Sequence, residues 1–137
     1  MKMKFEYLNP EQVDFIANGC GGKGGWIKPP NFIFFASCKH HDFRYWRGNT
    51  EAQRKEDDEL FYSWMKIDIA LMKLYEEDMT WRERAVSILK VSVKKVHYKI
   101  WAWTYYKVVR IGGRKYYYYA EQMKNIADLH REMEGRK

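Results

Sequence analysis

The stretch CKHHDFRYWRG, residues 38–48, contains His41 and Tyr45 four residues apart. On a helix this spacing puts both side chains on one face with Cys38, and Asp42 lies about 100° further round from His41. An imidazole and a carboxylate can then meet at the edge of one pocket, as a base beside a metal-binding carboxylate would. The alternative is a solvated polar face, which is the usual place for charged side chains.

The composition of the whole chain limits the possible fold and the possible partners. A chain of 137 residues that is 46% hydrophobic and 18% aromatic is long and apolar enough for one folded domain with a core. The net charge of +7 and the pI near 9.3 indicate an anionic partner, which is nucleic acid, an anionic membrane surface or an acidic protein. Two cysteines do not form a disulfide framework, although they can pair in an oxidising compartment.

The N-terminus does not read as a signal peptide. The basic residues of MKMK, residues 1–4, are followed by polar positions such as Glu6 and Asn9 rather than by an apolar segment. The sequence also contains no run of 18 apolar residues. We therefore expect cytoplasmic synthesis, with association with a virion or release without a classical signal as further alternatives.

A glycine-rich loop precedes the His-Asp stretch. Asn9, Pro10 and Glu11 predict the start of a short helix that ends at Asn18-Gly19, and CGGKGGW follows over residues 20–26. Such a loop can bind phosphate through N–H groups or a hard cation through carbonyl groups. Neither a Walker pattern nor a dinucleotide-binding pattern is present, so the cation is favoured over phosphate. A flexible linker is the structural alternative.

Two antiparallel helices are expected to carry the site. Asn31 predicts the cap of a helix that ends near Gly48, and Thr50 with Gln53 predicts a capping box for an amphipathic helix that reaches about Met79. The second helix would bring Asp57 and Asp58 near His41. The alternative is that these two acids lie in the first turn and offset the helix dipole.

The combined pattern resembles the calcium-dependent, secreted-type phospholipase A2 superfamily, and in particular its small, cysteine-poor bacterial, phage and viral members. The resemblance covers roughly residues 18–65, about a third of the chain. It is carried by the glycine-rich loop, the two prolines after it, and, in order, Cys38-x-x-His41-Asp42-x-x-Tyr45 and Asp58-x-x-Phe61. Each part alone is a weak signal, and the ordered combination is specific.

The resemblance implies a calcium site and a disulfide. The carbonyls of Cys20, Gly22 and Gly24 and the carboxylate of Asp42 would bind Ca²⁺, which prefers oxygen ligands. The loop departs from the usual pattern by one extra residue before Asp42, so that either Cys20 or Gly21 provides the first carbonyl. In this family a disulfide ties the calcium loop to the catalytic helix, and here only Cys20 and Cys38 could form it.

The resemblance also implies the catalytic roles. His41 would be the general base that activates a water, Asp58 would accept from its far ring nitrogen, and Tyr45 would hold Asp58. The neighbouring His40 is outside the pattern and is expected to be a solvated surface residue. A zinc site at residues 40–42 is a rival idea, but three consecutive helical residues cannot all face one ion.

The C-terminal part of the chain is aromatic and basic. Thr80 and Glu83 predict a capping box, followed by a helix over residues 85–110 that Gly112-Gly113 interrupts, and a last helix follows residues 116–119. We expect its aromatic rings to pack on the preceding helix or on another protein chain. Contact with lipid headgroups is the alternative, and a strand between Val86 and Val96 is a structural alternative.

Together these features predict an all-α protein. Residues 1–79 would form a phospholipase A2-like core, and residues 80–137 a helical extension packed on it within one compact unit. The expected function is calcium-dependent hydrolysis of the sn-2 ester at a phospholipid surface, preferably an anionic one. The alternatives are a catalytically weak structural or virion component, which can form homo-oligomers, and a basic aromatic nucleic-acid-binding module, which lacks any known reader motif.

Overall fold

The computed structural model describes residues 3–17, 19–21 and 29–136, and within these ranges it contains helices and no strand. This confirms the predicted all-α class. Two short 3-10 helices, η1 (Phe5–Tyr7) and η2 (Gly113–Tyr116), accompany the α-helices. The α-helices are α1 (Pro10–Ile16), α2 (Phe35–Arg47), α3 (Glu51–Ala70), α4 (Trp81–Gly112) and α5 (Ile126–Glu134).

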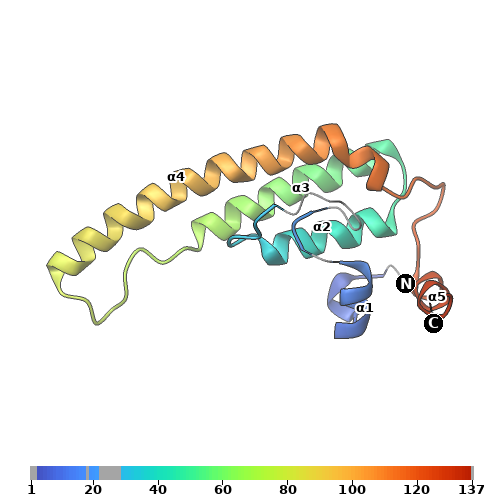
Figure 1. Ribbon diagram of the computed structural model, residues 1–137, viewed down its shortest axis with the longest axis horizontal. Coiled ribbons are helices and arrows are strands. Elements are labelled where there is room, and N and C mark those ends of the chain that lie inside the picture. The colour runs from blue at the N-terminus through green and yellow to red at the C-terminus, as the bar shows by residue number, and fades with distance from the viewer. Residues whose placement is uncertain (1–2, 18, 22–28, 137) are drawn as a thin grey trace.

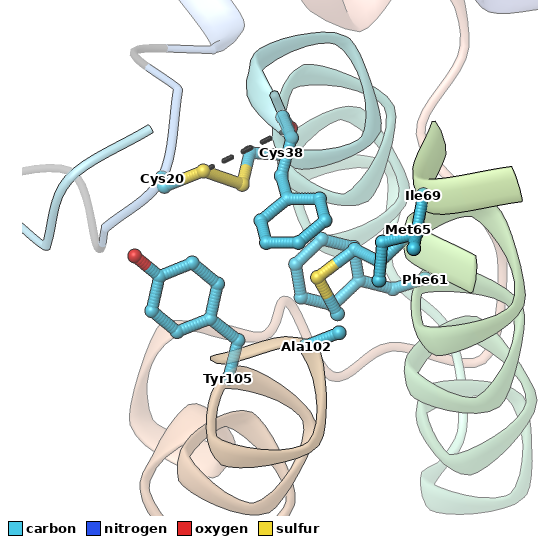
Figure 2. Close-up of a cluster of buried hydrophobic side chains, with 8 residues drawn as sticks. Cys20, Cys38, Phe61, Met65, Ile69, Ala102 and Tyr105 are labelled. Carbon is cyan, nitrogen blue, oxygen red and sulfur yellow. Dashed lines mark hydrogen bonds between the residues drawn. A yellow bond between two sulfur atoms is a disulfide. The ribbon is translucent and has the colours of Figure 1, made fainter. Parts of the chain in front are cut away.

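The three longer helices lie side by side. α2 and α3 run in opposite directions, and the second half of α4 returns along α3 (Figure 1). Their facing sides enclose the main apolar core, seen in Figure 2. The buried members of this core are Cys20, Phe34, Cys38, Phe61, Met65, Ile69, Ala102 and Tyr105.

A second apolar cluster joins the two ends of the chain to α2. Ile16 and Ala17 from the end of α1, Phe43 from α2 and Leu129 from α5 are its buried members. α1 and α5 therefore lie at the side of α2, near both termini (Figure 1). The C-terminal part of the chain contributes to both clusters.

The capping residues start the helices as the sequence predicts. Asn9 accepts from the backbone of Gln12 at the start of α1, where Pro10 is the first residue, and Thr50 accepts from the backbone of Gln53 at the start of α3. Only this half of the predicted Thr50–Gln53 capping box forms, because the side chain of Gln53 donates to Asp57 instead. Thr80 and Glu83 form the predicted capping box of α4. Each side-chain oxygen satisfies an N–H group that has no partner within its helix.

Three predicted boundaries are wrong. α2 begins at Phe35, because the side chain of Asn31 accepts from the backbone N–H of Cys20 at 2.9 Å instead of capping the helix. α3 ends at Ala70 rather than near Met79, and the acidic residues 76–78 would be unfavourable at the negative end of a helix. The last helix begins only at Ile126, after the Asn125 cap.

α4 is a continuous helix, so the alternative of a strand between Val86 and Val96 is wrong. Its buried residues are Ala102 and Tyr105, both in the part that packs on α3. Among the described residues, no helix is both long and apolar enough to cross a membrane.

The C-terminal segment closes the end of α2. Gly48 has φ +69°, and a Cβ atom there would overlap the backbone of Tyr118, so glycine is needed for this close approach. The backbone N–H of Tyr118 donates to the carbonyl of Tyr45 at 3.1 Å, and that of Lys124 donates to the carbonyl of Arg47 at 2.8 Å. Two carbonyls at the end of α2 thus gain partners from residues 118–124.

Candidate functional site

His41, Tyr45 and Asp58 meet between α2 and α3. The Nε2 atom of His41 lies 2.9 Å from Oδ1 of Asp58, and the hydroxyl of Tyr45 donates to the same oxygen at 2.7 Å. The His41 side chain is 7% exposed and the Asp58 carboxylate is fully buried. Asp58, rather than Asp57, is therefore the carboxylate that binds the histidine.

The local geometry sets the orientation of the histidine ring. The His41 ring stacks on Phe61 of α3 with 4.4 Å between centroids, and it contacts the ring of Tyr45 one helical turn along α2. An ionised carboxylate accepts hydrogen bonds and cannot donate them, so we assign the proton to Nε2. This assignment leaves Nδ1 as the basic nitrogen of the ring.

Two arginines also bind Asp58, and neither was predicted from the sequence. Arg54, one turn before Asp58 on α3, donates from Nη1 to Oδ2 at 3.3 Å, and Arg110 near the end of α4 donates to the same oxygen at 2.8 Å. The i,i+4 spacing of Arg54 could have revealed its role. Nothing in the sequence relates Arg110 to a residue 52 positions earlier.

The hydrogen bonds keep Asp58 charged. Burial by itself would raise the pKa of Asp58, but the hydrogen bonds from His41, Tyr45 and Arg110 outweigh it and the pKa lies below its usual value. Burial, together with the hydrogen bond to Asp58, raises the pKa of Tyr45. Tyr45 therefore stays protonated and acts as a hydrogen-bond donor.

Asp57 has a different set of partners. Its carboxylate accepts from Arg44 of α2 at 2.6 Å and from Gln53 at 3.0 Å. Because α3 begins at Glu51, Asp57 and Asp58 lie beyond its first turn. The interpretation of these two acids as first-turn partners of the helix dipole is therefore wrong.

The start of the glycine-rich loop is attached to α2. Cys20 and Cys38 form a disulfide, the pairing that the resemblance implies (Figure 2). Gly19 has φ +90°, and a Cβ atom there would lie 2.8 Å from the ring of Phe35. The chain therefore passes closely over the first turn of α2 before it enters the loop.

The predicted calcium ligands are described only in part. Gly22 and Gly24 lie outside the described residues, whereas Cys20 precedes them and Asp42 follows His41 on α2. Within the ranges that the structure describes, no group of three or more His, Cys, Asp or Glu side chains could hold a metal ion. Three of the four predicted ligands are backbone carbonyls rather than side chains of these types, so the calcium site stays a prediction.

From the sequence, His40 was predicted to be a solvated surface residue, and this prediction is wrong. Its ring lies 4.1 Å from that of Phe5 and 5.2 Å from that of Trp64, measured between centroids. Burial lowers its pKa, which favours the neutral form. His40 is thus a half-buried packing residue whose ring contacts Phe5 and Trp64.

Two surface hollows lie away from the His41–Asp58 pair. One, of about 540 Å³, lies between α1 and α5 and includes Gln12 and His130; the other, of about 610 Å³, is lined by residues between 118 and 132. Neither is lined by His41, Tyr45 or Asp58. The chemistry of the side chains, rather than the size of a hollow, identifies the candidate site.

Comparison of the chain with protein-family models, with curated proteins and with solved structures finds no match. Any assignment of function therefore depends on the residues of the site and on the resemblance that their order carries.

Proposed function

We propose that this protein is a calcium-dependent phospholipase A2, which hydrolyses the sn-2 acyl ester of glycerophospholipids. The observation that carries the proposal is the contact of His41 Nε2 with Asp58 Oδ1, where Tyr45 binds the same oxygen. This is the arrangement of an oriented base, in which a carboxylate selects the tautomer of an imidazole.

The proposed reaction uses the other ring nitrogen. Nδ1 of His41 takes a proton from a water molecule as the water oxygen bonds to the sn-2 carbonyl carbon. The buried charge of Asp58 stabilises the imidazolium. When the ester C–O bond breaks, the imidazolium returns its proton to the departing alkoxide, and the products are a fatty acid and a lysophospholipid.

The proposed cofactor is calcium, bound by the carbonyls of Cys20, Gly22 and Gly24 and by the carboxylate of Asp42. Oxygen donors of this kind suit Ca²⁺, which when bound supplies electrostatic stabilisation of the negative charge that develops on the ester oxygen. The disulfide supports this ligand set, because it attaches Cys20 to Cys38, four residues before Asp42 on the same helix. The proposed site of action is an anionic phospholipid surface, which suits the net charge of +7.

The experiment measures fatty-acid release from anionic phospholipid vesicles with millimolar calcium or with a chelator. We expect release only with calcium, and a loss of about 10²–10⁴-fold in His41→Gln, the usual contribution of a general base. His40→Gln is the matched control, because it removes a neighbouring imidazole that does not contact Asp58, and it should retain activity. Release by the native chain that does not exceed release by His41→Gln would overturn the proposal.

A second candidate is a structural protein that keeps this fold with weak activity or none. The observation that favours it is the sharing of Asp58 between His41 and two arginines, since ion-pair networks that serve stability also bury carboxylates. The same assay separates the two candidates. A structural role predicts a folded chain whose release of fatty acid, with or without calcium, does not exceed that of His41→Gln.

A further inference from the structure

α4 carries a second apolar stripe that the fold does not use. Six large apolar side chains recur along it with alternating spacings of three and four residues, and each of them is between 53% and 67% exposed. In heptad notation, position a is occupied by Val86, Val93 and Ile100, and position d by Leu89, Val96 and Trp103.

This stripe lies opposite the face that packs on the core. With Val86 at position a, position f falls at Val91, Tyr98 and Tyr105, and these residues are half-buried or buried. Position f is the one furthest from an a/d seam. The first half of α4 extends beyond the end of α3, as Figure 1 shows, so its outer face is left uncovered by the other helices.

We infer that two copies of this chain associate along α4 through the seam formed by Val86, Leu89, Val93, Val96, Ile100 and Trp103. The two helices lie parallel and in register, so that each of the six side chains meets its own counterpart. Position a is β-branched in all three heptads (Val86, Val93 and Ile100). In the first heptad Leu89 occupies position d, and a β-branched residue at a with Leu at d is the combination that favours two-stranded parallel coiled coils. This inference does not depend on the proposed hydrolysis.

The charges beside the seam permit this pairing. In the parallel arrangement, position g of one helix meets position e of the next heptad of the other, which pairs Ser92 with His97 and Lys99 with Thr104. No two lysines are brought together along the six layers. The seam ends at Lys107, the next a position, where two lysines would repel each other and the helices separate.

The area is sufficient for a stable pair. Because each of the six side chains is more than half exposed, burial of the seam in both copies removes on the order of 1,200 Å² from water, the lower end for specific interfaces. The helix is already held by its capping box and by α3, so association need not order it. A lipid-binding helix would need a broader apolar face than a strict a/d stripe, with a free polar face opposite.

The test is sedimentation velocity of the full chain over a wide range of concentration. We expect a monomer–dimer equilibrium, in which Val93→Glu raises the dissociation constant at least about tenfold by placing two carboxylates in one layer. Lys94→Gln changes the net charge equally at the adjacent, exposed position outside the seam and should leave the equilibrium unchanged. Circular dichroism checks that both variants keep their helix content.

Orientation is tested with Val96→Cys, since the native cysteines are joined to each other. A parallel, in-register pair brings the two new thiols together at position d, so that mild oxidation gives a covalent dimer, whereas Lys94→Cys gives none. The inference is overturned if the chain is monomeric, or if Val93→Glu leaves the dimer intact. If the chain is monomeric and Val93→Glu weakens its binding to anionic vesicles, the stripe contacts lipid instead of a second copy.

Discussion

Gly113 leaves the space that the hydroxyl of Tyr45 occupies, since a Cβ atom at position 113 would overlap that oxygen. The same hydroxyl donates to Asp58, so a glycine at the end of α4 determines whether the site between α2 and α3 can form. The relationship joins residues 68 positions apart in the chain.

Gly113→Ala should therefore displace Tyr45 from Asp58. We expect the free energy of unfolding to fall by about 1–3 kcal/mol, the usual cost of overpacking, as measured by urea denaturation. Gly112→Ala is the matched control, because a Cβ atom there has no neighbour within 4 Å. It should be neutral or stabilise the helix by up to about 1 kcal/mol. Equal effects of the two substitutions would contradict the packing described for Tyr45.

Stability should fall in acid because of Asp58. Its pKa is lowered in the folded state, so its contribution is present above the unfolded value of about 3.9 and is lost as the pH falls through the lower folded value. Hydrogen bonds from Arg54 and Tyr119 lower the pKa of Glu51 to about 2, which acts in the same direction. Urea denaturation at a series of pH values from 6 to 2 measures the decline.

Substitutions of single carboxylates show which of them cause the loss of stability in acid. Asp58→Asn should flatten the pH dependence and lower stability at neutral pH, and Glu51→Gln should remove a smaller, exposed part of the decline. Glu59→Gln changes an exposed acid on the same helix for which the ion pair is long, at 3.9 Å, and is the control. An unchanged pH dependence in Asp58→Asn would exclude Asp58 as its source.

The disulfide should contribute to the free energy of folding. Cys20 and Cys38 are 18 residues apart, and closing a loop of this length stabilises a protein by about 3 kcal/mol in the chain-entropy model. Addition of a reductant should lower the stability of the native chain by that order. The double variant Cys20→Ala/Cys38→Ala should be less stable than the oxidised chain and insensitive to the reductant. A native chain that is equally stable in both conditions would refute the prediction.

Calcium should stabilise the folded chain if the proposed ligand set is right. A ligand that binds only the folded state raises the unfolding temperature with its concentration, and this effect should be absent in Asp42→Asn. Asp14→Asn removes an exposed carboxylate on α1 and should keep the full calcium response. Thermal unfolding followed by circular dichroism measures both without an activity assay. A calcium response that survives in Asp42→Asn would remove Asp42 from the ligand set.

Local chemistry explains why several features could be predicted. Asn9, Thr50 and Thr80 begin helices through hydrogen bonds to residues three positions ahead, so the information lies within one helical turn. The i,i+4 relation between His41 and Tyr45 is equally local. The start of α2 was wrongly predicted because a distant residue competes: the side chain of Asn31 binds the backbone of Cys20 instead of capping α2.

By itself, the sequence determined the all-α class, the starts of α1, α3 and α4, and the order of the residues that form the candidate site, because these depend on short spacings along the chain. Only the tertiary structure decided that Asp58 rather than Asp57 binds His41 and that Arg110 joins it. It also decided which side of α4 is buried, since an apolar side chain at helical spacing fits a core or a partner equally well. Long-range packing makes that choice, and here it leaves Val93 and its neighbours along the seam exposed.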